Sequence, residues 1–371
     1  MKNVHITLVG AQPLPVFYPI YEYRPDIIYL IGTNQSKDVM DNLCATIKDN
    51  GMECTSRILD DAYDANKCKA LCDSIIFGEK DCTITFNLTG GSKPMALGAM
   101  WSAVLNNCEM IYTESKNCIN IRTSVKTPLR KYLPPELIFL LQVQRLKSYN
   151  TYTPNAERSK CAEEIRRQVF DPYKREVLDL LKAEYDRNRN HLGNRYSCDP
   201  VLYEKEGTTT ILTYKGTEIF RSDYPEADML MFEGRWWETL VADAIYKWAK
   251  DKYDVLTSVV FAPKEDDYTK DGIKIDKNEI DIAVNLGNKF LFVECKSGTF
   301  NQDDIYKLNR ITQTYGGDKS KSVLVSYHGF FYPKKDLKDK ARENKVDILS
   351  TNQNFSNIAK KLDRIINTLK A

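Results

Sequence analysis

The sequence predicts an α/β protein of two domains, and three observations support this. The chain of 371 residues exceeds the usual length of one domain. Residues 1 to about 125 alternate between short apolar runs and helical patterns, which favours a parallel, doubly wound sheet. Three prolines within 128–135 then end this pattern. We therefore expect one domain over residues 1–145, including a linker helix, and a second α/β domain over residues 146–371.

The strands of the first domain are predicted from apolar runs, each followed by a turn or a helical pattern. The helix that begins at Lys37 is a clear example, because it stops at Gly51. Ligands in such sheets sit at the carboxyl ends of the strands, so the loops that follow the strands are candidate binding segments. The predicted strands are Val4–Val9, Asp26–Ile31, Thr55–Leu59, Thr83–Leu88 and Glu109–Thr113, and the predicted helices are Lys37–Asn50, Asp64–Phe77 and Met95–Leu105.

Residues beyond the prolines mix helical and strand patterns. The first two helices would link the domains and help a dimer, or would simply pack as ordinary domain elements. The predicted helices are Glu136–Leu146, Cys161–Phe170, Lys174–Arg187, Trp236–Lys250, Asp303–Thr314 and Phe355–Leu369, and the predicted strands are Thr209–Tyr214, Glu218–Phe220, Glu279–Leu286, Lys289–Lys296 and Ser322–Ser326.

The composition is that of an ordinary globular protein. The net charge of +2 does not indicate nucleic-acid binding, and it leaves room for a local basic groove. Ten cysteines lie at irregular spacings without a C-x-x-C pair, so neither a zinc site nor a disulfide framework is expected. The first residues form a strand pattern, and no apolar run approaches the about 18 residues of a membrane span. We expect a cytoplasmic protein that does not contact membranes.

The stretch Asn278–Gly298 reads as two strands joined by Gly287-Asn288. A two-residue loop with glycine first is typical of a tight hairpin turn, and it fixes which residues face each other. Side chains alternate along a strand, so the acidic and basic residues of this hairpin would share one face and the apolar residues the other. The expected pairs are Leu286–Lys289, Ala283–Phe292, Asp281–Glu294 and Glu279–Lys296.

The pair of Asp281 and Glu294 is unusual. Directly opposed side chains have Cβ atoms about 4.5–5.5 Å apart, and like charges there are destabilising. A divalent cation would neutralise them, because Mg²⁺ is typically held by one or two carboxylates with water and phosphate. Lys296 could then orient a water or stabilise charge on a phosphorus-centred transition state. The alternative is an exposed strand face with a salt bridge between Glu279 and Lys296.

The loop N-L-T-G-G-S-K-P-M, residues 87–95, is the second informative motif. Its glycines allow close approach of the backbone, and the free N–H groups at the start of the following helix can bind an anion. Lys93 adds a positive charge. The spacing does not fit a Walker A loop, because no glycine directly precedes Lys93. The alternative is a tight strand-to-helix turn whose glycines serve its geometry alone.

The pattern D-x₁₂-E-C-K resembles that of the PD-(D/E)xK restriction-endonuclease-like nucleases. Their core also places a glutamate on a preceding helix, and the sequence G-R-W-W-E supplies Glu238 in the first turn of a predicted helix. No proline precedes Asp281, as is often the case in this superfamily. The resemblance implies that Asp281, Glu294 and the carbonyl of Cys295 hold Mg²⁺ or Mn²⁺. It implies also that Lys296 positions the attacking water and that Glu238 assists through a second metal or a water.

The T-G-G-S-K-P-M loop after a strand resembles the CARF domain, the Rossmann-like sensor of cyclic oligoadenylates in type III CRISPR defence. The resemblance implies a homodimer, because CARF domains pair about a twofold axis and cyclic tetra-adenylate shares that symmetry. It places the ligand contacts in three loops, at Gly10, Ala11, Gln12, Pro13, Thr33, Asn34, Gln35, Asn87, Thr89, Gly90, Gly91, Ser92, Lys93 and Met95.

The two resemblances together lead to one expected function. The protein would be a metal-dependent endonuclease that cyclic tetra-adenylate activates allosterically. It would cleave DNA and RNA, prefer single strands, nick duplexes and show little sequence specificity. Two alternatives stay open. One is a non-catalytic sensor that binds nucleic acid in response to the cyclic ligand, and the other is a first domain that cleaves its own ligand.

Overall fold

The computed structural model has a mixed α/β fold. It describes residues 1–114, 116–142, 146–171, 181–182, 185–186, 192–250, 252–261, 278–287, 289–316, 320–327, 335–350 and 358–367. The chain divides into two compact units, of which the first is built mainly on Met1–Leu146. The second comprises Lys147–Val260, Asn278–Leu286 and Phe290–Ala371. None of the described helices combines the length and the apolar character that crossing a bilayer requires.

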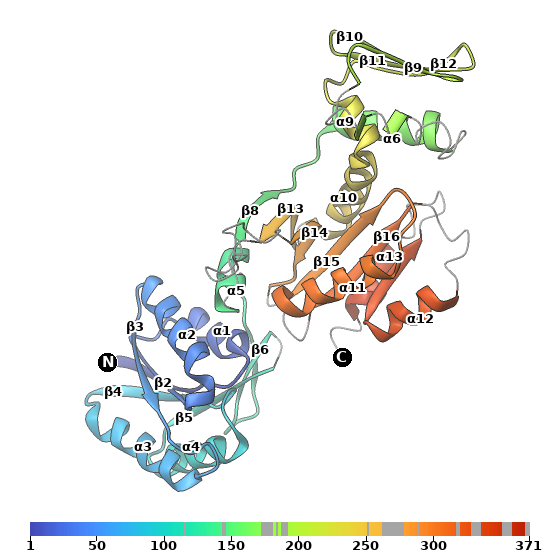
Figure 1. Ribbon diagram of the computed structural model, residues 1–371. Helices are drawn as coiled ribbons and strands as arrows, with labels where there is room; N and C mark the ends of the chain where they lie inside the picture. Colours follow the sequence, from blue (N-terminus) through green and yellow to red (C-terminus); the bar gives the residue numbers. More distant parts are fainter. Residues whose placement is uncertain are drawn as a thin grey trace, which may run out of the picture. The chain divides into compact units, whose positions relative to one another are not determined.

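The first unit contains a seven-stranded sheet of order β3-β2-β1-β4-β5-β6-β7 (Figure 1). Strands β1 to β5 are parallel, which confirms the predicted doubly wound sheet. The last two strands pair antiparallel at one edge and were not predicted. The strands are β1 (Lys2–Leu8), β2 (Ile27–Gly32), β3 (Glu53–Ile58), β4 (Cys82–Asn87), β5 (Glu109–Glu114), β6 (Asn117–Asn120) and β7 (Lys126–Pro128).

Helices cover both faces of this sheet. Figure 1 shows α3 and α4 on one face and α1 and α2 on the other. Buried Val4, Ile6 and Leu8 of β1 belong to the core beneath α3 and α4. The predicted helix Glu136–Leu146 ends early, at Leu141. The helices are α1 (Pro13–Tyr23), the short 3₁₀ turn η1 (Asn34–Ser36), α2 (Lys37–Asp49), α3 (Ala65–Gly78), α4 (Lys93–Leu105) and α5 (Pro135–Leu141).

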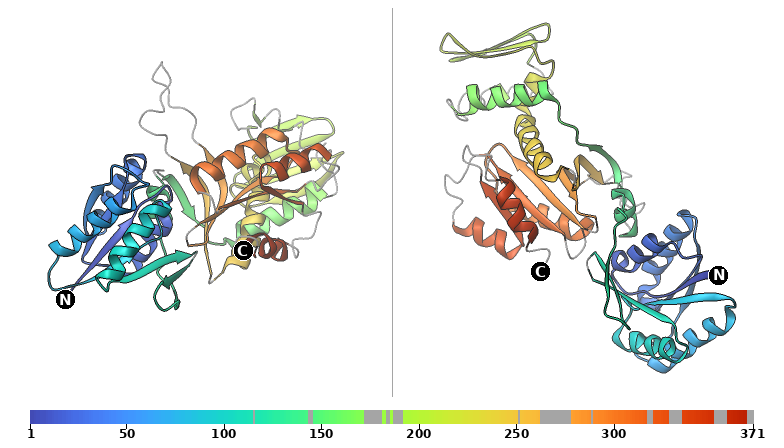
Figure 2. Two further views of the ribbon diagram at one scale, coloured as in Figure 1. Left: turned by 90° about the horizontal axis from the view of Figure 1, so that it is seen from below. Right: turned by 180° about the vertical axis from the view of Figure 1, so that it is seen from behind.

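The second unit contains two sheets. The larger has the order β17-β16-β15-β14-β13-β8, and the smaller has the order β12-β11-β10-β9. Figure 2 shows the smaller sheet at one end of this unit, beyond α6. The strands are β8 (Leu146–Thr151), β9 (Arg195–Cys198), β10 (Val201–Glu206), β11 (Thr209–Tyr214), β12 (Thr217–Ser222), β13 (Asp254–Phe261), β14 (Glu279–Asn285), β15 (Phe290–Lys296), β16 (Lys321–Ser326) and β17 (Val346–Ser350).

One hydrophobic core joins both sheets of the second unit. It contains Tyr203 and Phe220 from the smaller sheet, Trp236 from α10, and Val293 from the larger sheet. The predicted helix Lys174–Arg187 lies largely outside the described residues, as do both ends of the predicted C-terminal helix. The helices are α6 (Ala156–Ile165), α9 (Ala227–Phe232), α10 (Arg235–Ala249), α11 (Gln302–Ile311), α12 (Lys335–Glu343) and α13 (Ile358–Asn367), with the π-helical turns η2 (Arg166–Phe170) and η3 (Thr312–Gly316).

Candidate active site and candidate ligand loops

Helix α10 positions Glu238. The helix begins after Gly234, whose φ of +79° favours glycine. Trp236 and Trp237 are fully buried in its first turn, and the indole Nε1 of Trp237 donates to the carbonyl of Val325 over 3.0 Å. This hydrogen bond fixes the start of the helix against β16. Glu238, the next residue, lies close enough to Glu294 for the two charges to interact.

The hairpin β14–β15 has the register that the sequence predicts. Ala283 pairs with Phe292, and Gly287 in the turn has a φ of +97°, whereas Asn288 lies outside the described residues. The ladder ends at the pair Ile282–Val293, one pair short of Asp281 and Glu294. There Oδ2 of Asp281 accepts a hydrogen bond from the Cys295 amide over 2.7 Å. The two strands therefore do not pair further at the position of the candidate site.

Both faces of β15 are buried, whereas the alternative considered from the sequence was a strand with one face exposed to solvent. Leu291 and Val293 contribute to the core as expected, but Phe290 and Phe292, on the same face as Glu294, are also fully buried. Glu294 itself is only 6 % exposed. A carboxylate in such surroundings requires a compensating positive charge.

Three carboxylates at this end of the hairpin interact electrostatically. Burial raises the pKa of Asp281 well above its ordinary value, and the charges of Glu294 and Glu238 raise it further. Burial also raises the pKa of Glu238. The charges of Arg235 and Arg158 oppose this rise, and those of Glu294 and Glu279 add to it. The charges of the three carboxylates therefore act on one another, while the direct pairing of Asp281 with Glu294 stays a prediction.

Lys296 supplies part of the compensating charge. Its Nζ lies 3.1 Å from Oε1 of Glu294 and 3.0 Å from Oδ1 of Asp304, and Nζ of Lys307 lies 3.8 Å from the same Glu294 oxygen. Burial lowers the pKa of Lys296, but Glu294 and Asp304 raise it above its ordinary value, so the side chain is an ammonium. The described ion pairs of Lys296 do not include the salt bridge to Glu279 considered as the alternative from the sequence.

Asp304 and Lys307 are the site residues that the sequence reasoning missed. Both belong to α11, and Asp304 closes its capping box, because its Oδ2 accepts from the Asn301 amide over 2.9 Å. The signal in the sequence was an N-cap asparagine followed three residues later by an acid, shortly after the E-C-K motif. A capping box predicts where the helix starts, but it does not show that the same carboxylate also reaches Lys296.

The donor set fits a hard divalent cation. Among the described residues, no group of three or more His, Cys, Asp and Glu side chains is close enough to hold a metal ion. Mg²⁺ does not need such a cage, because one or two carboxylates with several waters usually suffice. The N–H of Cys295 points toward Asp281, and the N–H and C=O groups of one strand residue point to the same side. By this geometry the Cys295 carbonyl lies on the same side of β15 as Asp281.

We expect the Asp304→Asn variant to need more metal for cleavage. Without the Asp304 carboxylate, the ammonium of Lys296 would bind Glu294 alone and compete more strongly with a cation. A partly buried ion pair contributes about 1 kcal/mol, so the Mn²⁺ concentration for half-maximal cleavage would rise about fivefold, with little change in the rate at saturating Mn²⁺. The amide oxygen of the introduced asparagine can still accept from the Asn301 amide and keep the cap. Cleavage rates measured over a range of Mn²⁺ concentrations test this prediction. The control is Asp303→Asn, which changes the exposed neighbouring aspartate. If Asp304→Asn needs no more Mn²⁺ than the wild type, the prediction is contradicted.

In the first unit, the three predicted ligand loops follow the adjacent strands β2, β1 and β4 at their carboxyl ends. The loops after β1 and β4 touch. A Cβ atom added to Gly10 would lie 3.1 Å from the amide nitrogen of Gly91, and one added to Gly90 would lie 2.2 Å from the carbonyl oxygen of Leu8. Glycine is therefore required at Gly90 for the backbones to approach, and a φ of +77° favours it at Gly91.

The side chains of the third loop fall into two groups. Asn87 is fully buried: its Nδ2 donates to the Val16 carbonyl over 3.1 Å, and its Oδ1 accepts from Thr89. Ser92 caps α4 by accepting from the Met95 amide over 3.2 Å. Lys93, in contrast, is exposed at the start of the helix. Asn87 and Ser92 thus shape the loop, whereas Lys93 is free to meet an anion.

Two family models match separate parts of the chain. Residues 3–117 match the model described as "HFX_2341_N:-like, N-terminal". Residues 226–367, which contain the carboxylates and lysine of the candidate active site, match the model described as "Card1-like, endonuclease domain". The comparison with curated proteins found no match.

Several solved structures share the fold. Can2 from Sulfobacillus thermosulfidooxidans, in complex with cyclic tetra-adenylate, has a TM-score of 0.73 at 16% identity and matches 98% of this chain and 99% of its own. The protein VC1899 from Vibrio cholerae has a TM-score of 0.75 at 15% identity, over 99% and 98% of the two chains. A type III CRISPR defence DNA nuclease activated by cyclic oligoadenylate has a TM-score of 0.58 at 16% identity, over 88% of this chain and 45% of that one.

At these identities the likeness of structures establishes the fold, while the family model identifies the domain that carries the acidic cluster. Residues 226–367 match a Card1-like endonuclease domain, and the chain as a whole has the fold of Can2 and of VC1899.

Proposed function

We propose that the protein is a metal-dependent endonuclease that cyclic tetra-adenylate activates, and that it cleaves single-stranded DNA and RNA with little sequence specificity. The observation that carries the proposal is the electrostatic interaction of Asp281 with Glu294 and Glu238, together with the ion pair of Lys296 and Glu294, within the residues that match the endonuclease model. Acidic groups that are buried near one another destabilise a fold, and groups with pKa values perturbed in this way cluster at functional sites.

Each residue of this site would have a separate role in phosphodiester hydrolysis. Asp281, Glu294 and the Cys295 carbonyl would hold Mg²⁺ or Mn²⁺, which supplies Lewis-acid stabilisation of charge at the scissile phosphate. The ammonium of Lys296, released from Glu294 but still paired with Asp304, would orient the attacking water by hydrogen bonding. Glu238 would accept a hydrogen bond from a second water. None of these residues reads a base, so little sequence preference is expected.

A test of the proposed function is a cleavage assay with the full chain. Single-stranded DNA and RNA are each incubated with Mn²⁺ and with cyclic oligoadenylates of different ring size, in the presence and absence of EDTA. Cleavage that requires both the metal and cyclic tetra-adenylate supports the proposal. Absence of cleavage under all these conditions, with the cyclic ligand still bound, would favour the second candidate function.

That second candidate is a non-catalytic sensor that binds nucleic acid when the cyclic ligand is present. One observation favours it: Glu294 is neutralised by Lys296 and Lys307, so the described residues compensate this charge without a cation. Asp281 argues against it, because its described partner is the neutral amide of Cys295 and its carboxylate stays unpaired with any cationic side chain in the described part of the chain.

We also propose a homodimer that forms through one face of α4. Leu97, Trp101, Val104 and Leu105, the α4 stripe, lie on one side of the helix and are between 50% and 64% exposed. A neighbouring side of α4 is fixed against α3, where a Cβ atom on Gly98 would lie 2.2 Å from the Ala65 carbonyl oxygen. The same helix begins at the third candidate loop, so a twofold axis near the stripe would bring two copies of that loop to one symmetric ligand.

We expect Lys93→Ala to weaken the binding of cyclic tetra-adenylate at least tenfold. The exposed ammonium at the start of α4 adds to the free N–H groups of the helix, and a charge-assisted hydrogen bond to a phosphate of this kind corresponds to about a tenfold or larger change in affinity. Calorimetric titration measures it. The control is Lys80→Ala. Lys80 is an exposed lysine just before the amino end of β4, whereas the candidate loops follow the carboxyl ends of the strands. Equal affinities of the two variants for cyclic tetra-adenylate would show that Lys93 and the start of α4 do not bind a phosphate of this ligand.

A further inference from the structure

Lys307 on α11 differs from Lys296 in its exposure and in its contacts. The side chain of Lys307 is 50% exposed, whereas that of Lys296 is 27% exposed. The 3.8 Å between Nζ of Lys307 and Oε1 of Glu294 is an ion-pair distance, and it is too long for a hydrogen bond. Glu294 is the one ion-pair partner of Lys307 among the described residues. The ammonium of Lys307 therefore lies at the solvent-exposed edge of the candidate active site.

The two lysines would respond differently to a cation at Glu294. Lys296 also contacts Asp304 over 3.0 Å, so it keeps a carboxylate partner when the cation binds. Lys307 has no second carboxylate of this kind in the described part of the chain. A cation at Glu294 neutralises the charge that attracts Lys307 and leaves its ammonium to pair with another anion. A nucleic-acid strand at this site brings its phosphates as such anions.

Helix α11 carries a second exposed basic residue near Lys307. The buried side of the helix consists of Ile305, Leu308 and Ile311, and the helix packs on β16 and β17 of the larger sheet. Arg310 follows Lys307 by three residues and is exposed. Residues three apart on a helix are surface neighbours, with Cβ atoms about 5–6 Å apart. Both side chains can therefore reach one phosphodiester backbone.

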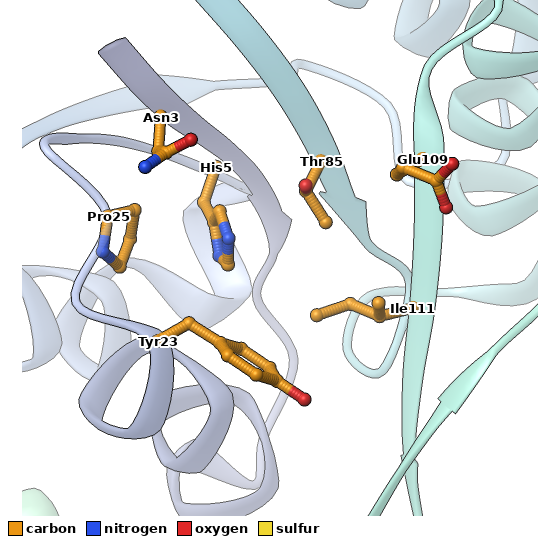
Figure 3. A pocket seen from close by; sticks show the side chains of 7 residues that line it. All are labelled: Asn3, His5, Tyr23, Pro25, Thr85, Glu109 and Ile111. Atoms are coloured by element: carbon orange, nitrogen blue, oxygen red, sulfur yellow. The ribbon is translucent and has the colours of Figure 1, made fainter. Parts of the chain in front are cut away.

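The groove of about 350 Å³ in the first unit does not offer a comparable site. Figure 3 shows its lining, which comes from β1, β4, β5, the end of α1 and the residue Pro25. None of the lining residues is a lysine or arginine, and Glu109 adds a carboxylate that would repel a phosphate. Of these two features, α11 is the one that offers positive charge to a nucleic-acid backbone.

We propose that Lys307, together with Arg310, binds backbone phosphates of the single strand next to the scissile phosphate. This subsite rests on the proposed function, because it takes Asp281 and Glu294 as the site of the cation. Lys307 binds the strand and takes no part in bond breaking. It pairs with Glu294 when the site holds no cation, and with a phosphate when the cation is bound. The cation and the strand therefore bind cooperatively.

The experiment measures strand binding apart from cleavage. Fluorescence anisotropy follows a labelled single-stranded DNA titrated with the full chain and cyclic tetra-adenylate over a range of KCl concentrations, in Ca²⁺ and in EDTA, and gel electrophoresis checks that the strand stays intact. In Ca²⁺, Lys307→Gln is expected to bind about fivefold more weakly than the wild type. The slope of log K against log salt should become shallower by about 0.7, the value for one phosphate contact on a single strand.

Two comparisons show whether the effect comes from a phosphate contact. Lys307→Arg keeps the charge and should retain the wild-type affinity and salt slope. In EDTA the difference between the wild type and Lys307→Gln should fall below about twofold, because Lys307 then pairs with Glu294. A merely structural role of Lys307 would change neither the salt slope nor the response to Ca²⁺.

The matched control is Lys360→Gln. Lys360 is an exposed lysine of α13, and Leu362 of the same helix belongs to the core that contains Val293, on the face of β15 opposite to Glu294. This variant should bind the strand as the wild type does. The subsite is overturned if the wild type binds no strand, if Lys307→Gln keeps the wild-type affinity and salt slope in Ca²⁺, or if Lys360→Gln loses as much affinity.

Cleavage of the same strand with saturating Mn²⁺ separates this inference from the proposed function. Lys307→Gln should need about fivefold more strand for half-maximal cleavage, with a maximal single-turnover rate within about threefold of the wild type. If the wild type binds the strand with the expected metal dependence but does not cleave it, the proposed function fails and the phosphate subsite stands. If the wild type cleaves and Lys307→Gln loses no affinity, the subsite fails and the proposed function stands.

Discussion

Replacing Glu294 with glutamine is expected to lower the rate of cleavage about 10³-fold. The substitution keeps the size of the side chain and removes its charge, and so it removes one of two carboxylates proposed to hold the cation. Stabilisation by a metal of several kcal/mol in the transition state corresponds to a change in rate of about this size. Single-turnover cleavage of a labelled single strand, with saturating cyclic tetra-adenylate and Mn²⁺, measures it.

Two controls separate this effect from damage to the fold. Glu294→Gln should bind the cyclic ligand as the wild type does, because the candidate loops belong to the first unit. Its thermal midpoint should not fall much, since the loss of the ion pair with Lys296 is offset by reduced repulsion from Asp281. A Glu294→Gln protein that cleaves within tenfold of the wild-type rate would remove Glu294 from the active site.

Replacing Trp101 with glutamate is expected to separate the dimer and to abolish activation by the cyclic ligand. Trp101 lies at the centre of the α4 stripe and is 51% exposed. In a twofold interface the change occurs in both copies, so two charges would be buried at the same contact. A central interface residue of this kind contributes about 2–4 kcal/mol, so the dimer dissociation constant should rise at least about 10²-fold.

Sedimentation at several protein concentrations measures the change in assembly, and a cleavage assay follows activation in parallel. Trp101→Phe keeps an apolar ring at the same place and should remain dimeric and activatable. A Trp101→Glu protein that is still a dimer would show that the interface lies elsewhere. A monomer that the cyclic ligand activates fully would show that pairing is not part of the response.

The hairpin and the helix that carry the candidate site could be predicted from the sequence, because strong local signals determine both elements. The glycine-first turn at Gly287 sets the hairpin register, and the observed pairing of Ala283 with Phe292 agrees with it. The amphipathic pattern after Gly234 locates α10 within one residue at each end. Local chemistry of this kind acts over a few residues and can therefore be read directly.

Other elements depend on distant contacts, and the sequence did not reveal them. Helix α1 begins at Pro13 and also contains Pro15 and Pro19, residues that usually end a helix; here Pro13 occupies a first-turn position, where its missing N–H costs nothing. The short strands β6 and β7 form by pairing at the edge of the sheet rather than by their own propensity. The contact of Asp304 with Lys296 likewise depends on how α11 packs.

The central claim is that Asp281 and Glu294 together hold a divalent cation. Electron paramagnetic resonance of free Mn²⁺, titrated with wild-type protein, Asp281→Asn and Glu294→Gln, tests it directly. The wild type is expected to bind Mn²⁺ and each variant to bind it at least about tenfold more weakly. Equal binding of Mn²⁺ by all three proteins would contradict the claim.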